Sequence, residues 1–181
     1  MKTPARAGTG PAARPLGELK DLMLRDPRLT LAVAESLTCG RLQARIGAIS
    51  GASEFFRGGM TAYALDAKVR HLGVDRAEAE AANGVSGRIA EQMARGACVL
   101  FGADLGLSTT GYAEPSAERG VAEPFAWWGL ARRLPDGGFA VASGRADCRG
   151  LTRVGAQERA ASAALEALLA WLRAPAAART P

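Results

Sequence analysis

The sequence predicts a single-domain α/β protein, an α/β/α sandwich around a mixed β-sheet. Short apolar runs typical of buried strands alternate with amphipathic helical segments early in the chain, which favours parallel strands joined by helices. A hairpin signal, Pro135-Asp136-Gly137-Gly138, comes late and adds antiparallel strands. The length of 181 residues and the hydrophobic content of 48% fit one core of ordinary size.

The first elements follow from hydrophobic spacing. Leu16 to Leu24 has helical spacing, and Leu29 to Ala34 is a short apolar run rich in β-forming residues, which predicts a buried strand. The buried side of the next helix is marked by Leu42, Ile46 and Ile49. Ser36 therefore falls at the C-terminal end of a strand and beside a helix N-terminus, where free N–H groups can receive an anion.

The middle of the chain continues the alternation. Gly58 to Ala64 predicts a second strand that delivers Tyr63, and a helical turn carrying Lys68 follows. Ser86 is the expected N-cap of a long amphipathic helix that ends near residue 100. Ala103 to Thr109 predicts a third strand.

The last third contains a loop, a hairpin and a helix. A loop rich in Gly, Pro and Glu is expected from Gly111 to Pro124. Phe125 to Arg132 and Phe139 to Ser143 predict the two strands of the hairpin, and a final helix is expected from Val154 to Leu172. The domain is expected to span residues 16–173, with flexible tails over 1–15 and 174–181.

Bulk properties narrow the possible partners. The net charge of +5 and pI near 9.6 suit a nucleic-acid-binding protein, but the arginines are scattered and aromatic content is only 6%. We therefore expect solvated surface arginines, no nucleic-acid partner, and a surface that suits an anionic small molecule. No apolar run approaches the roughly 20 residues of a membrane span, so no membrane association is expected.

Cysteine and histidine usage points to a reducing compartment. Cys39, Cys98 and Cys148 are odd in number and widely spaced, which is not typical of a disulfide framework. The N-terminal segment lacks the apolar region of a signal peptide, so a cytoplasmic location is expected. A single histidine and the lack of paired cysteines predict no zinc site.

Lys68 is unusual because this chain rarely uses lysine. Only Lys2, Lys20 and Lys68 are lysines among 23 basic residues, and Lys68 alone lies in the middle of the chain. Arginine supplies charge equally well but does not lose its proton at biological pH, whereas a buried lysine can do so and then act as a general base.

Ser36, Lys68 and Tyr63 together suggest a Ser–Lys hydrolase. Ser36 is the candidate nucleophile, Lys68 the base, and Tyr63 a hydroxyl able to relay or stabilise the proton. The only histidine, His71, is expected at an exposed helix end, which disfavours a Ser-His-Asp triad. The amides from Thr38 to Gly40 could supply an oxyanion hole. Taken singly, the serine is better explained as a helix N-cap and the lysine as an exposed helix residue, and the tyrosine could be a core aromatic.

An ordered series of motifs resembles the CinA C-terminal domain family over about residues 16–173. The matching segments are Ala34-Glu35-Ser36-Leu37-Thr38-Cys39-Gly40, Gly51-Ala52-Ser53-Glu54-Phe55-Phe56-Arg57-Gly58-Gly59-Met60-Thr61-Ala62-Tyr63, Ala67-Lys68-Val69, Leu72-Gly73-Val74, Gly84-Val85-Ser86, Gly102-Ala103-Asp104-Leu105-Gly106, Thr109-Thr110-Gly111 and, more weakly, Arg153. Any one of these motifs is weak, and their order makes the resemblance specific.

The resemblance implies an activity, a fold and a set of site residues. Active members of the family are nicotinamide-nucleotide amidases, which convert nicotinamide mononucleotide and water to nicotinate mononucleotide and ammonia in pyridine-nucleotide recycling. The family fold is a compact α/β sandwich that commonly self-associates, so a homo-oligomer with a small-molecule nucleotide substrate and no cofactor or metal is implied. The implied catalytic residues are Ser36, Tyr63 and Lys68, and the implied substrate-binding residues are Thr38, Cys39, Gly40, Thr110, Gly111 and Arg153.

The chain departs from the family pattern at the expected substrate end. Cys39 stands where the family usually has glycine, and a positive φ there would strain the backbone. After Gly111 the family has a glycine-rich run, whereas this chain has Tyr112 to Arg119 with Glu114 and Glu118 added. We expect either a changed substrate or a catalytically silent homologue that binds a nucleotide or a protein, and a surface loop that tolerates charge is the third interpretation.

Overall fold

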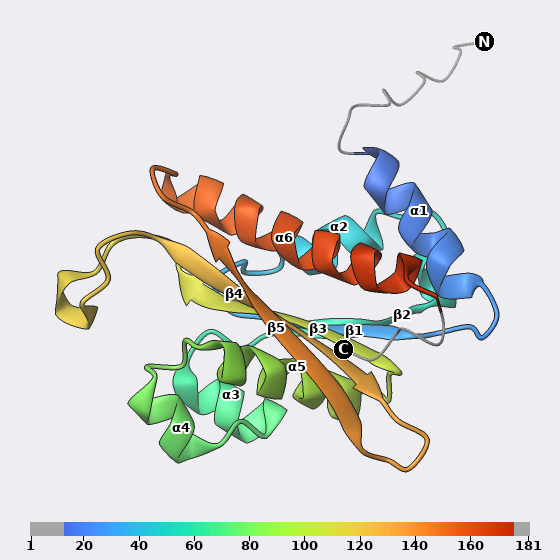
Figure 1. Ribbon diagram of the computed structural model, residues 1–181, viewed down its shortest axis with the longest axis horizontal. Coiled ribbons are helices and arrows are strands. Elements are labelled where there is room, and N and C mark those ends of the chain that lie inside the picture. Colours follow the sequence, from blue (N-terminus) through green and yellow to red (C-terminus); the bar gives the residue numbers. More distant parts are fainter. Residues whose placement is uncertain (1–12, 176–181) are drawn as a thin grey trace, which may run out of the picture.

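The computed structural model describes residues 13–175 and builds them around one five-stranded sheet (Figure 1). The strands are β1 (Leu31–Glu35), β2 (Phe56–Thr61), β3 (Leu105–Tyr112), β4 (Phe125–Arg133) and β5 (Phe139–Asp147), in the spatial order β2-β1-β3-β4-β5. β1 is parallel to both of its neighbours, and β4 is antiparallel to β3 and β5. The predicted mixed sheet is confirmed.

Helices cover both faces of the sheet, which gives the predicted three-layer α/β sandwich (Figure 1). One face carries α3 (Leu65–Leu72), α4 (Arg76–Ala81) and α5 (Gly87–Phe101), and the other carries α1 (Ala13–Leu24), α2 (Arg41–Gly47) and α6 (Arg153–Arg173). In the interior strand β1, Val33 packs on the side of the sheet covered by α6, while Ala32 and Ala34 pack on the side covered by α5. This alternation explains why the strand is apolar from Leu31 to Ala34 and polar only at its last residue, Glu35.

Small residues let α5 lie directly on the sheet. A Cβ at Gly106 would lie 1.9 Å from the carbonyl oxygen of Ala94, and one at Gly129 would lie 2.3 Å from that of Ala90. The Ser108 hydroxyl donates a hydrogen bond to the same Ala90 carbonyl at 2.5 Å. The helix is therefore held against the strands through its backbone, which fixes the position of the turn that precedes it.

Several element boundaries differ from the sequence expectation. β2 ends at Thr61, so Tyr63 lies in the link before α3 rather than in a strand. The helix α4 was not predicted, because its sequence is rich in Ala and Glu and carries no large apolar residue to give a period. α1 begins at Ala13, inside the segment 1–15 predicted as a tail. The rest of that tail, and residues 176–181 of the other, lie outside the described residues.

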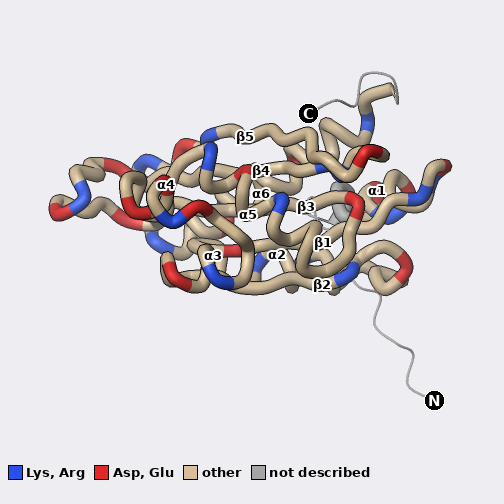
Figure 2. The backbone as a smooth tube through the Cα atoms, turned by 90° about the horizontal axis from the view of Figure 1, so that it is seen from below, with Lys and Arg blue, Asp and Glu red and all other residues tan. Residues whose placement is uncertain are grey.

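Two surface properties bear on possible partners. Acidic and basic residues are interspersed along the chain rather than gathered in one stripe (Figure 2). Among the helices of residues 13–175, none is both long and apolar enough to cross a bilayer.

The Ser86 side chain accepts a hydrogen bond from the Ile89 amide and caps α5, as predicted.

Candidate active site

Ser36 is the first residue after β1, at the edge of the sheet where the parallel strands have their C-terminal ends. Its amide donates to the Thr109 carbonyl of β3 at 2.9 Å, so its backbone is held by the sheet. The residue is 6% exposed, and its side chain lines a cavity of about 380 Å³. The backbone of Ser36 is therefore fixed at the C-terminal edge of the sheet, where ligands of α/β proteins commonly bind.

Lys68 lies on α3 and is buried rather than exposed, with only 3% of its surface accessible. Its Nζ donates to the Gly84 carbonyl at 2.9 Å and to Thr110 Oγ1 at 3.0 Å. The Thr110 hydroxyl in turn donates to the same Gly84 carbonyl at 2.7 Å. Two of the three donor directions of an ammonium are thereby fixed, and Lys68 also lines the cavity that holds Ser36.

Burial lowers the pKa of Lys68 from 10.5 to about 8, because the low-dielectric interior disfavours the charged form. At pH 7 about a tenth of the folded molecules then carry a neutral amine, against roughly one in three thousand for an ordinary lysine. A neutral amine is a competent general base, so the environment gives Lys68 a property that no arginine could provide.

The rim of the cavity is formed by exposed polar residues. Tyr63 is 55% exposed, and its hydroxyl accepts a hydrogen bond from Arg153 Nη2 at 3.0 Å. Arg153 Nη1 also pairs with Glu114 Oε2 at 2.5 Å. Glu114, from the loop that departs from the family pattern, thus binds Arg153, the residue that the resemblance assigns to substrate binding.

The structure brings together most, but not all, of the residues predicted for the site. Ser36, Tyr63, Lys68, Gly111 and Arg153 all line the cavity. Thr110 lies behind Lys68 and is fully buried, so it contacts the lysine rather than the open space.

Thr38, Cys39 and Gly40 lie away from the cavity lining, because they form the turn into α2 around the buried carboxylate of Glu35. Glu35 accepts hydrogen bonds from a set of donors at that helix start: Thr38 Oγ1 at 2.7 Å, and the amides of Gly40 at 2.9 Å, Leu42 at 3.1 Å and Gln43 at 2.9 Å. The free amides expected at this helix N-terminus are therefore already occupied by an internal anion. The Cys39 amide is also engaged, with the Ser36 carbonyl at 3.2 Å.

Cys39 adopts a left-handed backbone conformation with φ of 53°, which fulfils the condition under which a non-glycine residue here is strained. Its side chain is exposed and forms no disulfide.

Two contributors were not identified from the sequence. Glu35 was quoted only as part of a motif, and its burial depends on donors that α2 supplies in three dimensions. Asn83 lines the cavity with φ of 50°, and the Asn83-Gly84 pair is a turn signal that could have marked this position. The turn matters because it presents the Gly84 carbonyl to Lys68.

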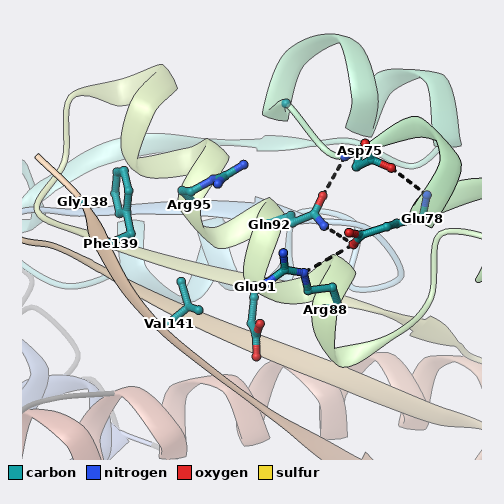
Figure 3. Close-up of a pocket in the computed structure, with 10 residues that line it drawn as sticks. Asp75, Glu78, Arg88, Glu91, Gln92, Arg95, Gly138, Phe139 and Val141 are labelled. Carbon is teal, nitrogen blue, oxygen red and sulfur yellow. Dashed lines mark hydrogen bonds and ion pairs between the residues drawn. The ribbon is translucent and has the colours of Figure 1, made fainter.

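A larger cavity of about 600 Å³ lies between α4, α5 and the β4–β5 turn (Figure 3). Its polar side chains bind one another: the Gln92 carboxamide accepts from the Asp75 amide at 2.7 Å and donates to Glu78, which also pairs with Arg88 at 3.4 Å. Within residues 13–175 no group of three or more His, Cys, Asp or Glu side chains is arranged to hold a metal ion.

The fold and site define an α/β sandwich with a serine at a strand end and a buried lysine in the same cavity. The sequence matches the CinA C-terminal domain model over residues 15–172, and the chain belongs to that family. The CinA-like protein of Chlorobium limicola is 39% identical over 160 residues, covering 87% of this chain and 37% of that protein. The CinA-like protein of Chlorobaculum tepidum is 41% identical over 154 residues, covering 83% and 36%. The chain thus spans little more than a third of these curated relatives.

Solved structures of the CinA superfamily share the fold. The protein from Enterobacter cloacae superposes with a TM-score of 0.80 at 25% identity, covering 95% of this chain and 98% of that one. The protein from Escherichia coli gives a TM-score of 0.76 at 27% identity, covering 93% and 94%. A Klebsiella pneumoniae protein at 23% identity, with a TM-score of 0.80 and coverage of 90% and 98%, supports the fold alone.

Proposed function

We propose that this chain is an amidohydrolase that cleaves a carboxamide C–N bond with Ser36 as nucleophile and Lys68 as general base. The observation that carries the proposal is the shared cavity of these two side chains, in which burial lowers the pKa of the lysine to about 8. A serine needs a nearby base, and a lysine that is partly neutral near pH 7 is one.

The proposed reaction has two halves. Lys68 Nζ takes the Ser36 hydroxyl proton as Oγ bonds to the carboxamide carbon. The C–N bond then breaks, and the proton passes to the leaving nitrogen, which departs as ammonia. In the second half, a water molecule gives a proton to Lys68 Nζ as its oxygen attacks the carbonyl carbon of the ester. The C–Oγ bond then breaks, the carboxylic acid product leaves, and Nζ returns the proton to the Ser36 oxygen. Because the Cys39 and Gly40 amides are engaged, we assign the oxyanion contact to the amide of Leu37, which lines the cavity beside the nucleophile.

The first substrate to test is nicotinamide mononucleotide, which the family resemblance suggests. A cavity of about 380 Å³ suits the nicotinamide end of such a molecule, and Tyr63 lies at its rim. No cofactor enters the proposed reaction, and self-association of the chain remains a prediction.

A second function, nucleotide or protein binding without catalysis, is favoured by one observation. Arg153 is already held by Glu114 and Tyr63. Lys68 directs its two hydrogen bonds to Gly84 and Thr110 rather than to Ser36. A silent homologue would keep this geometry and release no product.

The deciding experiment is ammonia release from nicotinamide mononucleotide by the purified chain, beside Ser36→Ala, Lys68→Ala and Lys68→Arg. We expect all three variants to lose at least about a thousandfold in kcat, because arginine keeps the charge but cannot accept the proton. Activity that survives in Lys68→Arg would contradict the general-base assignment. If the wild-type chain releases no ammonia while the nucleotide still raises its Tm, the binding function stands instead.

A further inference from the structure

A second cavity, of about 450 Å³, adjoins the Ser36 and Lys68 cavity. The two share part of their walls, since Asn83 and Tyr112 line both. The second cavity is lined by residues at the end of α4 and by residues of the segment between β3 and β4. That segment projects beyond the sheet (Figure 1). A ligand that reached from the first cavity into the second would therefore pass Asn83 and Tyr112.

Three neighbouring strands deliver an aromatic and basic row to this cavity. Tyr112 and Phe125 face each other across the β3–β4 pair, with ring centroids 5.7 Å apart in an edge-to-face arrangement. Arg145 of β5 lies with its guanidinium carbon 4.3 Å from the centre of the Phe125 ring. Stacking on the ring holds the guanidinium plane and leaves its N–H edges for an acceptor.

A second arginine comes from the loop that departs from the family pattern. The 3-10 turn Ala117–Arg119 lies in a loop closed by paired backbone hydrogen bonds between Ser116 and Val121, at 2.8 and 2.9 Å. Arg119 donates a hydrogen bond to the Asn83 side chain, which ties the loop to the wall between the cavities.

The arginines that line the two cavities differ in whether a carboxylate neutralises them. In the part of the chain that the structure describes, neither Arg119 nor Arg145 forms an ion pair with a carboxylate, although Glu123 also lines the cavity. Asp147, also on β5, forms its ion pair with Arg149 at 2.6 Å, and Arg145 adds only a longer-range charge interaction that helps to lower the pKa of Asp147. Arg153 at the first cavity, by contrast, already holds Glu114.

We propose that the second cavity is the subsite for the anionic group, a phosphate or a comparable dianion, of the ligand whose amide end lies between Ser36 and Lys68. The proposal rests on the proposed function for the orientation of the ligand. Arg119 and Arg145 hold the anion, Tyr112 lies beside the link between its two ends, and Arg153 positions Tyr63 rather than the phosphate. The altered loop thus relocates anion recognition instead of removing it.

The test measures binding to Ser36→Ala protein, which cannot turn the ligand over. Affinities for nicotinamide mononucleotide and for its dephosphorylated riboside are compared in this background and with Arg119→Met, Arg145→Met and, as a matched control, Arg57→Met, which removes an exposed charge elsewhere on the sheet edge. We expect each of the first two substitutions to weaken mononucleotide binding at least about tenfold and riboside binding less than about twofold. Arg57→Met should change neither, and Arg119→Lys should recover part of the loss.

Other outcomes overturn the subsite. Equal losses for the two ligands would mean that the arginines support the fold, and a selective loss with Arg153→Met alone would place the phosphate at the first cavity. If the mononucleotide does not bind, inorganic pyrophosphate is the probe: it must raise the Tm of the wild-type chain but not of Arg145→Met, and no shift in the wild type refutes the subsite.

The ammonia assay separates this proposal from the amidase. A selective loss of binding in a chain that releases no ammonia keeps the subsite and rejects the amidase. Ammonia release with a KM that Arg119→Met and Arg145→Met leave unchanged keeps the amidase and rejects the subsite.

Discussion

Replacing Lys68 by methionine tests whether the fold bears the cost of a buried ammonium. Methionine keeps a long unbranched side chain, and the Gly84 carbonyl retains its hydrogen bond from Thr110. The fall of the Lys68 pKa from 10.5 to about 8 corresponds to about 3 kcal/mol against the charged form in the folded state. At pH 7 we therefore expect Lys68→Met to be more stable than the wild type by about 1 to 3 kcal/mol. The gain comes from removing the buried charge, and the loss of the two hydrogen bonds made by the lysine reduces it.

The same pKa fixes how stability depends on pH. Below pH 8 both the folded and the unfolded chain hold the proton, and the folded state bears the full cost. Between about 8 and 10.5 the folded state has released the proton while the unfolded state still binds it, so this residue makes stability rise with pH. Above 10.5 the cost is gone. The rise should be present in the wild type and missing in Lys68→Met.

Urea unfolding at pH 7, 8, 9 and 10 measures both effects, with Lys20→Met as the control. Lys20 pairs with Glu54 at the surface at 2.7 Å, so its removal should leave the slope between pH 8 and 10 unchanged. The reasoning is refuted if Lys68→Met is less stable than the wild type at pH 7 and keeps the wild-type slope. In that case the ammonium would be stabilised by its two acceptors and would not serve as a base near pH 7.

Three further substitutions test the supporting structure by urea unfolding. Cys39→Gly should stabilise the chain by roughly 0.5 to 1 kcal/mol, because glycine accepts φ of 53° without strain; a loss of stability would mean that the thiol makes a necessary contact. Glu35→Gln should destabilise by roughly 2 to 4 kcal/mol, since an amide group would face backbone donors that now bind a carboxylate; a change below 1 kcal/mol would contradict this. Gly106→Ala should cost roughly 3 kcal/mol or more, because its Cβ would lie 1.9 Å from a helix carbonyl, and near-neutral behaviour would show that α5 can move outward.

The order of strands and helices could be predicted because burial sets a period that the sequence displays. β1 is apolar from Leu31 to Ala34 since both of its faces are covered, and Ser86 caps α5 through the side-chain contact that its residue type favours. α4 could not be predicted in this way, because only Ala79 of its six residues is buried and no apolar period arises. Short surface helices are set by their caps, here Asp75, more than by a hydrophobic face.

Several residues that line the candidate site could be predicted from the sequence, but their contacts could not. Chain order places Ser36 and Lys68 near the sheet edge, yet the acceptors of the lysine come from Gly84 and Thr110, 16 and 42 residues away in the sequence. The oxyanion hole expected at Thr38 to Gly40 illustrates the difficulty. The N-terminus of a helix favours a bound anion, and the sequence suggested that this anion belongs to a ligand. Only the fold shows that the Glu35 side chain takes this place.

The chemistry and the specificity of this site depend on different parts of the fold. Lys68 is held by buried hydrogen bonds to Gly84 and to Thr110 of β3, so its position does not depend on a contact with the loop after β3. Arg153 and Glu114 are each about half exposed, and such a surface pair contributes no more than about 1 kcal/mol. A change in the loop can therefore rearrange the rim while Lys68 stays in place. The acidic loop is thus compatible with the proposed general base, and in our proposal it affects which anion the chain binds rather than whether the lysine can take a proton.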